Sequence, residues 1–363
     1  YGSLPKALVK FHKYADRSVS PIGEHFIEAV LYAGDLKNNT NIHFTIPEQN
    51  LEDFKEEVLE LEKLFKLIKG YQINTEFSFQ MISTNTISIN ESGEPVRDNN
   101  GDILLRAGGH GSLIGNLNKL SSDIIFIKNI DNITTGDRLN NIVESKKIIG
   151  AYLIEIRDKI FNSLKTLPRI IKDGESINEI YCFAKDVLNI SFPAEFIEFD
   201  LEKKRKSLLD KLNRPVRVCG MVKNMNEPGG APFWIENKNG ETTLQIIEGS
   251  QIDMDSSEQK EIFTQSSYFN PVDIVCSIKD HRGNIFDLNE FIEETRYFIS
   301  EKSHGNEKIS VLEHPGLWNG SMEKWISLYV EVPLTTFNPV KYVNDLLKDN
   351  HKPSTDTSFS ELF

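Results

Sequence analysis

Residues 123–132 have the sequence DIIFIKNIDN, and this stretch decides the fold class. Its first half is a run of isoleucine and phenylalanine that is typical of a buried parallel strand. The polar residues 129–132 follow directly, and in open α/β sheets ligands bind outside the carboxyl ends of the strands. An aspartate there can hold Mg²⁺ that bridges phosphate oxygens. The stretch therefore predicts an α/β protein with Asp131 near a ligand, although an Asx turn or helix cap is the alternative for this segment.

Helix-like and strand-like segments alternate on the N-terminal side of this stretch. Pro21 favours the start of a helix. Further on, apolar residues spaced by three and four predict a long helix that ends at Gly70. This order predicts a mostly parallel sheet with helices on both faces. The expected helices cover residues 22–32 and 50–69, the expected strands cover residues 41–46 and 74–82, and a hairpin turn is expected at residues 98–101.

The pattern changes twice on the C-terminal side. Residues 137–213 are rich in helix-like segments, which indicates a helical insertion. The halves of the α/β domain are then residues 1–136 and 214–350, and a polar tail, residues 351–363, is expected to be frayed. The expected helices cover residues 139–167, 177–188, 201–212 and 339–348, and the expected strands cover residues 216–222, 233–247, 269–278 and 326–332.

Composition narrows the class of function. The chain has 41 Lys and Arg against 54 Asp and Glu, a net charge of −13. This excess argues against general nucleic-acid binding, because phosphates are contacted mainly by clustered basic side chains. No apolar run reaches the roughly 18 residues of a membrane-spanning helix. The cysteines, Cys182, Cys219 and Cys276, are widely spaced, which indicates free thiols in a reducing, cytoplasmic compartment rather than disulfides or a zinc site.

Several other segments carry candidate chemistry. The glycines of RAGGHGS, residues 106–112, let a ligand approach the backbone, but a tight turn explains them equally well. Lys341 would lie on the first turn of the last expected helix, where a cation opposes the helix dipole and favours a bound anion. Glu248, at a strand end, suits sugar hydroxyls, although such a residue is more often a surface acid. A lone lysine such as Lys6 is usually solvated, and it becomes a candidate site residue only together with these motifs.

Short motifs occur in a characteristic order along the chain: LPK (4–6), FSFQ (77–80), GGHG (108–111), NIDN (129–132), EPGG (227–230), IE (247–248), FN (269–270) and FNPVK (337–341). This order resembles that of UDP-sugar pyrophosphorylases. Over nearly its whole length the chain is also similar to an uncharacterised bacterial family, domain-of-unknown-function family 4301. The segments that carry this second similarity are LPKALVKFHKY (4–14), LLRAGGHGSLIGNLNKL (104–120), IIFIKNIDN (124–132), RVCGMVKN (217–224), PGGAPFW (228–234), FNPVDIVC (269–276) and PGLWNGSMEKW (315–325).

The resemblance implies a Rossmann-like mixed α/β sheet of the nucleotide-diphospho-sugar transferase type, with a helical insertion. It implies a nucleotidyltransferase in which a sugar 1-phosphate attacks the α-phosphate of a nucleoside triphosphate such as UTP, and pyrophosphate leaves without a covalent intermediate. Mg²⁺ is the implied cofactor, and neither nucleic acid nor a membrane is an expected partner. The alternatives are a non-catalytic nucleotide-sugar-binding protein and a glycosyltransferase of the same fold.

The resemblance also implies roles for single residues. Lys6 would face the triphosphate, Lys341 would neutralise the sugar-phosphate oxygens, and Asp131 would bind Mg²⁺. The remaining implied contacts are Gln80 and the backbone of Gly109, His110 and Gly111 with the base, Gly230 and Glu248 with the sugar, and Asn270 beside the sugar.

The chain departs from the pyrophosphorylase pattern at three places. The glycine-rich loop that ends in Thr-Arg should precede Lys6, so the first strand and the main triphosphate cradle are expected to lie before Tyr1. Asp273 stands where the pyrophosphorylases carry a second asparagine, and His110 replaces an asparagine between the glycines. The missing loop motivates the binding-protein alternative.

Overall fold

The computed structural model describes residues 4–170, 173–225, 229–237, 240–305, 307–316 and 320–362. The chain divides into two compact units. The first contains residues 1–80, 126–150 and 331–363, and the second contains residues 81–125 and 151–330. Strand β7 (Ile125–Ile127) and helix α4 (Asn140–Thr166) each contain a boundary between the units. Residues 238–239 of the expected strand 233–247, and parts of the EPGG and PGLWNGSMEKW segments, lie outside the described residues.

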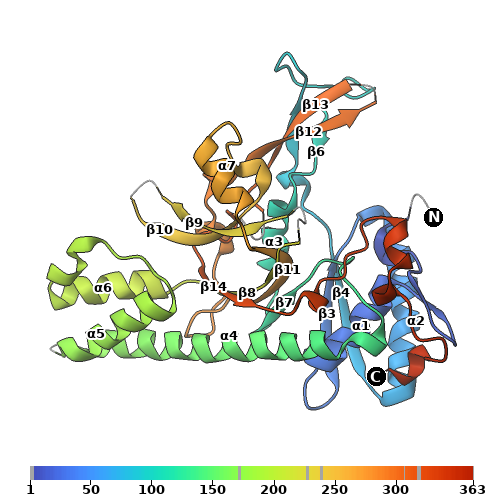
Figure 1. The fold of residues 1–363 in the computed structure, drawn as a ribbon, viewed down its shortest axis with the longest axis horizontal. Coiled ribbons are helices and arrows are strands. Elements are labelled where there is room, and N and C mark those ends of the chain that lie inside the picture. Colours follow the sequence, from blue (N-terminus) through green and yellow to red (C-terminus); the bar gives the residue numbers. More distant parts are fainter. Residues whose placement is uncertain are drawn as a thin grey trace. The chain divides into compact units, whose positions relative to one another are not determined.

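The first unit is built on the parallel pair β3 (Asn39–Thr45) and β4 (Gln72–Ser78). Helices α1 (Pro21–Tyr32) and α2 (Leu51–Lys69) belong to the same unit (Figure 1). These four elements confirm the predicted order of helices and strands in this region. Gly70 ends α2 with a φ of 72°, a left-handed conformation that glycine adopts without a steric penalty. The short strands β1 (His12–Lys13) and β2 (Ser18–Val19) complete the unit.

The C-terminal segment packs on the core of this unit. The side chain of Phe359 is completely buried. Its ring centroid lies 5.4 Å from that of Tyr14 and 6.2 Å from that of Phe65. The backbone N–H of Ala15 also donates to the carbonyl of Thr357, at 3.0 Å. The prediction of a frayed tail is wrong because Phe359, together with Leu362, packs against the core of this unit.

Replacing Phe359 by leucine is expected to lower the free energy of unfolding by about 1 kcal/mol, since aromatic pairs contribute about 0.5–1.5 kcal/mol beyond their burial. Urea unfolding measures this change. Leu36, whose side chain is fully exposed, provides the control, because Leu36→Ala should alter the free energy by less than about 0.5 kcal/mol. Equal stability of the Phe359→Leu variant and the wild type would contradict the packing of this segment.

In the second unit, β14, β8 and β11 are neighbouring strands of one sheet, in that order. Strands β8 (Val216–Lys223) and β11 (Tyr268–Ser277) pair antiparallel, while β14 covers Ile326–Glu331. The prediction of a mostly parallel sheet is therefore wrong for this pair. Strands that are buried on both faces have similar apolar sequences whichever way they run, so periodicity does not give their direction. The antiparallel hairpin of β9 (Ala231–Glu236) and β10 (Thr242–Ile247) lies between β8 and β11 in the sequence.

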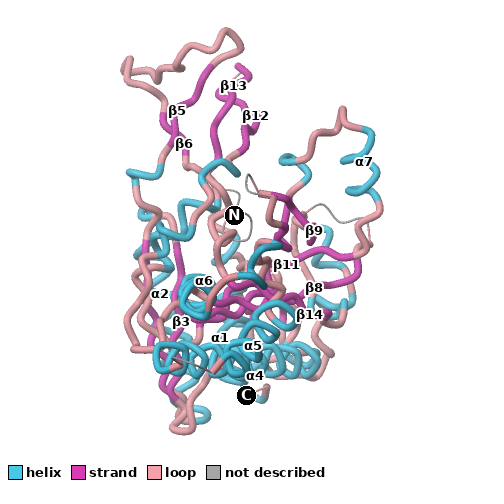
Figure 2. Tube along the Cα trace, turned by 90° about the vertical axis from the view of Figure 1, so that its left-hand side faces the viewer, coloured by secondary structure: helices cyan, strands magenta, loops and turns pink. Residues whose placement is uncertain are grey.

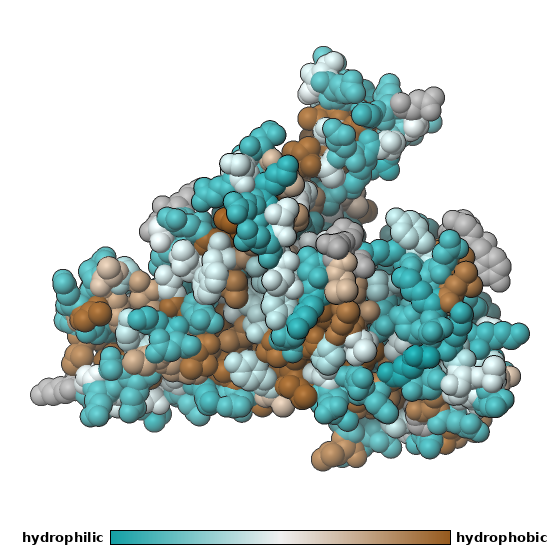
Figure 3. Space-filling model, in the orientation of Figure 1, coloured by the Kyte–Doolittle hydropathy of each residue, from teal (hydrophilic) through white to brown (hydrophobic). Residues whose placement is uncertain are grey.

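A further sheet in the second unit was not predicted. Its strands follow the order β12-β13-β5-β6 and lie together in Figure 2. One face of this sheet covers a small core, whereas apolar side chains are exposed on the other face. In Figure 3 brown, hydrophobic surface is visible at this sheet. The strands cover Phe298–His304, Glu307–Glu313, Thr86–Ile89 and Leu105–Arg106, the core contains Val96, Ile309 and Val311, and the exposed side chains include Ile87, Leu105 and Ile299.

Three of the remaining helices, α4, α5 (Gly174–Cys182) and α6 (Leu201–Leu212), agree with the sequence predictions. Helix α5 continues into a π-helical turn. In addition, α3 covers Ile114–Leu117 and α7 covers Ser257–Thr264. Within the described ranges, none of the helices combines the length and the apolar character that crossing a membrane requires.

Candidate functional site

Three motifs that are far apart in the sequence meet in the first unit. Nζ of Lys6 lies 3.0 Å from Oδ2 of Asp131 and donates a second hydrogen bond, also of 3.0 Å, to the carbonyl of Val340. The side chains are partly accessible, with exposed fractions of 49% for Lys6 and 23% for Asp131. The cluster therefore combines a cation and a carboxylate that solvent reaches. We call Lys6, Asp131 and Val340, with the adjacent Lys341, the lysine–aspartate cluster.

Backbone hydrogen bonds hold the NIDN and FNPVK segments side by side. The N–H of Val340 donates to the carbonyl of Asp131 at 2.9 Å, and the N–H of Ile133 donates to the carbonyl of Asn338 at 3.3 Å. The side-chain oxygen of Asn132 accepts from the N–H of Asn338 at 2.7 Å, and both asparagines are buried. These hydrogen bonds join the NIDN and FNPVK segments into one unit, which we call the ledge and which contains Asp131 and Lys341.

Helix α1 anchors this ledge through a buried carboxylate. The two oxygens of Glu28 accept from Nζ of Lys128 at 2.7 Å each, and Nε2 of His25 donates to the carbonyl of Ile130 at 3.0 Å. Burial alone would raise the pKa of Glu28, but the charge of Lys128 and the hydrogen bond from His25 outweigh it and hold the pKa at about 2. Glu28 is therefore ionised near neutral pH and fixes the segment that leads into Asp131.

Sequence reasoning missed these supporting residues, although a signal was present. Helix α1 places Glu24 and Glu28 four residues apart in an otherwise apolar stretch, PIGEHFIEAVLY. Residues with this spacing share one face of a helix. Both glutamates are completely buried, and carboxylates are rarely buried without partners. Two acids on a buried face therefore indicate a polar network, here with Lys128 and His25 as partners of Glu28.

Lys341 does not lie on a helix, contrary to the sequence prediction for residues 339–348. A short 3₁₀ turn covers only Val343–Leu347, two residues further on. The carboxylate of Asp345 accepts from the N–H groups of Lys341 and Tyr342, at 2.8 Å each. This side-chain bonding competes with regular helical bonding and limits the segment to one turn. Lys341 therefore does not oppose a helix dipole. Its link to Asp131 is the backbone hydrogen bond from the preceding residue, Val340, to the Asp131 carbonyl.

The GGHG loop belongs to the second unit, and packing explains its glycines. Gly109 has a φ of 75°. A Cβ on Gly108 would lie 2.5 Å from the carbonyl oxygen of Thr84, and a Cβ on Gly111 would overlap the carbonyl of Pro315. These contacts favour the tight-turn interpretation of the glycines. The exposed His110 begins the 3₁₀ turn that follows.

The predicted sugar contacts also belong to the second unit. The N–H of Asn270 donates to the carbonyl of Gly230, and its side-chain amide donates to the carbonyl of Gly220, both at 2.8 Å. Its side-chain oxygen accepts from the N–H of Val272, so Asn270 holds an irregularity in β11. Glu248 caps the 3₁₀ turn Gly249–Gln251 at the end of β10. The structure thus brings Gly230 and Asn270 together.

Gln80 and Asp131 complete the predicted set. Gln80 follows β4 at the end of a segment of the first unit and is half-buried. Asp131 is one carboxylate, and across the described residues no group of three or more His, Cys, Asp or Glu side chains suits a metal ion. Mg²⁺ is often held by one or two carboxylates together with substrate phosphates. A single accessible carboxylate such as Asp131 fits this mode of Mg²⁺ binding.

Comparison with known proteins gives a family and a fold. The profile of a family described as "Domain of unknown function (DUF4301)" matches residues 1–352. No curated protein matches the sequence. Among solved structures, UDP-glucose phosphorylase from Trypanosoma brucei is similar, with 14% identity, 94% of this chain and 60% of that chain covered, and a TM-score of 0.50. The S374W mutant of UDP-glucose pyrophosphorylase from Leishmania major, in complex with UDP-glucose, has 13% identity, coverages of 94% and 61%, and a TM-score of 0.49. The chain thus spans about three-fifths of these proteins and shares a mixed α/β fold with the former.

Proposed function

This chain belongs to the DUF4301 family, and from that premise we propose that it is a nucleotidyltransferase. It joins a nucleoside triphosphate to a sugar 1-phosphate and releases pyrophosphate. The lysine–aspartate cluster carries the proposal, because it gathers three separate motifs around one accessible cation and one accessible carboxylate. The shared fold with a UDP-glucose phosphorylase supports the class of reaction and leaves the nucleotide and the sugar open.

The chemistry of the cluster suits a polyphosphate with its metal. In phosphoryl transfer the protein contributes mainly positioning and charge neutralisation. Lys6 and Asp131 neutralise each other at 3.0 Å without substrate. With substrate bound, Lys6 would pair with phosphate oxygens, and Asp131 would bind the metal ion that accompanies them. Lys6 would then pair with a phosphate in place of Asp131, and Asp131 would pair with the metal ion in place of Lys6, so both charges would stay compensated.

The surrounding residues orient the reactants in this proposal. Asp131 would hold Mg²⁺, which would supply positive charge beside the triphosphate. Lys6 binds the triphosphate, and Lys341, carried on the same ledge, receives the sugar phosphate. Gln80, in the same unit, contributes to binding the base. The roles that the resemblance implies for the second unit, namely the base contact of Gly109–Gly111 and the sugar contacts of Gly230, Glu248 and Asn270, stay predictions. The attacking phosphate oxygen is already ionised at neutral pH, so the reaction needs no general base.

The proposal predicts Mg²⁺-dependent release of pyrophosphate from a nucleoside triphosphate only when a sugar 1-phosphate is present. A panel that crosses the four ribonucleoside triphosphates with glucose, galactose and N-acetylglucosamine 1-phosphates tests it. Replacing Asp131 by asparagine keeps the shape but removes the charge. This change is expected to raise the Mg²⁺ concentration for half-maximal rate by about 10-fold or more.

Asp123 supplies the matched control for Asp131. It also pairs with a lysine, Lys279, at 2.6 Å, and its side chain is exposed. Asp123→Asn should therefore leave the Mg²⁺ dependence unchanged. Nucleotide-sugar binding without turnover by the wild type would favour the binding-protein alternative. Transfer of the sugar to an acceptor, with release of the nucleoside diphosphate, would favour the glycosyltransferase.

A further inference from the structure

Four polar side chains form a buried network in the first unit. Oε1 of Glu24 accepts from the hydroxyl of Tyr14 at 2.7 Å and lies 2.7 Å from Nδ1 of His12. Nε2 of His12 in turn lies 3.0 Å from Nδ1 of His351. Each of these four residues is 3% exposed or less. We call His12, Tyr14, Glu24 and His351 the histidine network.

The histidine network joins three parts of the first unit. His12 and Tyr14 lie at β1, Glu24 lies in α1, and His351 ends the 3₁₀ turn Asp349–His351. The hydroxyl of Tyr14 also accepts from the N–H of Gly136 at 2.7 Å. The network therefore holds the C-terminal segment against β1 and α1.

The residue before His351 is hydrogen-bonded to the ledge and to the residues that follow it. The carbonyl of Asn350 accepts from the N–H of Thr135 at 3.3 Å and from the hydroxyl of Thr134 at 2.6 Å. The side-chain amide of Asn350 donates to the side-chain oxygen of Asn338 at 2.7 Å. By fixing this turn, His351 supports the ledge that contains Asp131.

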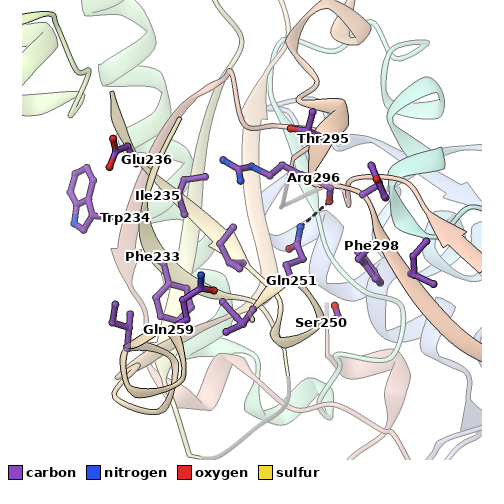
Figure 4. A pocket seen from close by; sticks show the side chains of 15 residues that line it. Phe233, Trp234, Ile235, Glu236, Ser250, Gln251, Gln259, Thr295, Arg296 and Phe298 are labelled. Atoms are coloured by element: carbon purple, nitrogen blue, oxygen red, sulfur yellow. Dashed lines mark hydrogen bonds between the residues drawn. The ribbon is translucent and has the colours of Figure 1, made fainter. Parts of the chain in front are cut away.

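The polar groups of a pocket in the second unit show the more usual arrangement. This pocket of about 700 Å³ lies between β9 and the start of β12. The side-chain amide of Gln251 donates to the carbonyl of Arg296 at 2.9 Å, drawn as a dashed line in Figure 4. The guanidinium of Arg296 pairs with both carboxylate oxygens of Glu323, at 2.8 and 3.2 Å. Nε2 of His351 differs, because it is buried and has no hydrogen-bond partner in the part of the chain that the structure describes. Such a group calls for an explanation.

The contact between the two imidazoles limits how many protons they hold. Two ring nitrogens 3.0 Å apart form a hydrogen bond only when one carries a hydrogen and the other offers a lone pair. Two imidazolium rings would each present an N–H, so His12 and His351 carry at most one positive charge between them while the contact lasts. A proton on Nε2 of His351 would also be a buried, charged donor without an acceptor, which costs more than an unpaired neutral group.

Burial changes how the network titrates. It lowers the pKa of His351 to about 4, and the charge of His12 adds to this shift. Burial also raises the pKa of Glu24, and it raises the pKa of Tyr14, whose phenol therefore keeps its proton. A histidine that is released into water has a pKa of about 6.5. The other charged groups that face the network are Glu28 in α1, Asp137 near Tyr14, and Asp345 and Lys348 near His351.

From this geometry we propose that the histidine network is a pH-sensitive latch for the C-terminal segment. At neutral pH the hydrogen bond between His12 and His351 holds the turn Asp349–His351, and protonation of both imidazoles releases it. Because a released His351 binds a proton more readily than the held one, release becomes easier as the pH falls from about 6.5 to about 4. Release withdraws Asn350 from Asn338 and so removes a support of the ledge. The latch is a property of the folded first unit and does not depend on the proposed reaction.

Hydrogen exchange of the full chain, followed by mass spectrometry at pH 7.5 and pH 5 and corrected for the intrinsic exchange rate, tests the latch. Protection of residues 349–362 is expected to fall by about 10-fold or more at pH 5, while β8 and β11 keep theirs. His351→Asn keeps a polar atom near the position of Nδ1 but cannot be protonated, so protection should change by less than about 2-fold. His12→Gln removes the opposing charge and should respond less than the wild type. His110→Asn is the control and should respond as the wild type does, because His110 is exposed and belongs to the second unit.

Three results would overturn the latch. The first is equal protection of residues 349–362 in the wild type at both pH values. The second is a loss of protection at pH 5 in both His351→Asn and His12→Gln that matches the wild type. The third is a parallel loss in β8 and β11, which would show general unfolding in acid. If the His351→Asn segment is already unprotected at pH 7.5, the response of His12→Gln decides.

Discussion

Lys6→Ala is expected to reduce kcat for pyrophosphate release by about 10²–10³-fold, the usual cost of removing one group that stabilises charge in a transition state. The free energy of unfolding should change by less than about 1 kcal/mol, because partly exposed ion pairs contribute little to stability. The position of Lys6 explains why the rate should fall strongly while the stability changes little. Lys6 lies on the surface of the first unit, yet it contacts two segments that are more than 100 residues away in the sequence.

Lys10 provides the control for this prediction. Its Nζ pairs with Glu57 at 2.6 Å, and its side chain is 41% exposed, close to the 49% of Lys6. Lys10→Ala should therefore match Lys6→Ala in stability and retain wild-type turnover. Lys341→Ala should also reduce turnover, since Lys341 directly follows Val340, whose N–H is hydrogen-bonded to the backbone carbonyl of Asp131. Normal turnover by both cluster variants would remove the lysines from the mechanism.

Glu28→Gln is expected to lower the free energy of unfolding at neutral pH by about 3–5 kcal/mol, the range for removing one partner of a buried ion pair. The amide keeps the size of the carboxylate but leaves the charge of Lys128 uncompensated, and both side chains are nearly inaccessible. Because Glu28 holds the segment before Asp131, kcat should fall as well. Glu52→Gln is the control, since Glu52 pairs with Lys55 on the exposed face of α2.

The stability difference between wild type and Glu28→Gln should depend on pH, because the pKa of Glu28 is lowered to about 2 from an ordinary value of 4.5. A carboxylate with a depressed pKa stabilises the folded state above its unfolded pKa, and this contribution is lost as the pH falls through its folded value. The stability difference between wild type and Glu28→Gln should therefore be full above about pH 5 and shrink towards pH 2. Urea unfolding between pH 7 and pH 3 measures it. A difference that is constant with pH would contradict the ionised pair.

Sequence reasoning recovered the elements whose signal is local. The helices α1, α2, α4 and α6 follow from apolar spacing and end residues, and Gly70 adopts the left-handed conformation that its position predicted. The motif order placed Lys6, Asp131 and the FNPVK segment in one group, and the structure brings these three together.

The failures concern information that is not local. The direction of β8 against β11 depends on the path of the chain between them, which apolar runs do not encode. The position of the tail depends on Phe359 and Leu362, which pack on a core made by residues that are distant in the sequence. The helix at Lys341 fails because Asp345 captures two backbone N–H groups. The glycines of the GGHG loop are required by close contacts with Thr84 and Pro315, which the loop sequence alone does not reveal.

The most direct test of the lysine–aspartate cluster is a double-mutant cycle for pyrophosphate release with Lys6→Ala, Asp131→Asn and the variant that carries both changes. If the two residues serve one substrate complex, the double variant should be about as slow as the slower single variant, a coupling of about 1 kcal/mol or more in kcat/KM. Losses that simply multiply, or wild-type rates in both single variants, would show that Lys6 and Asp131 do not form one catalytic site.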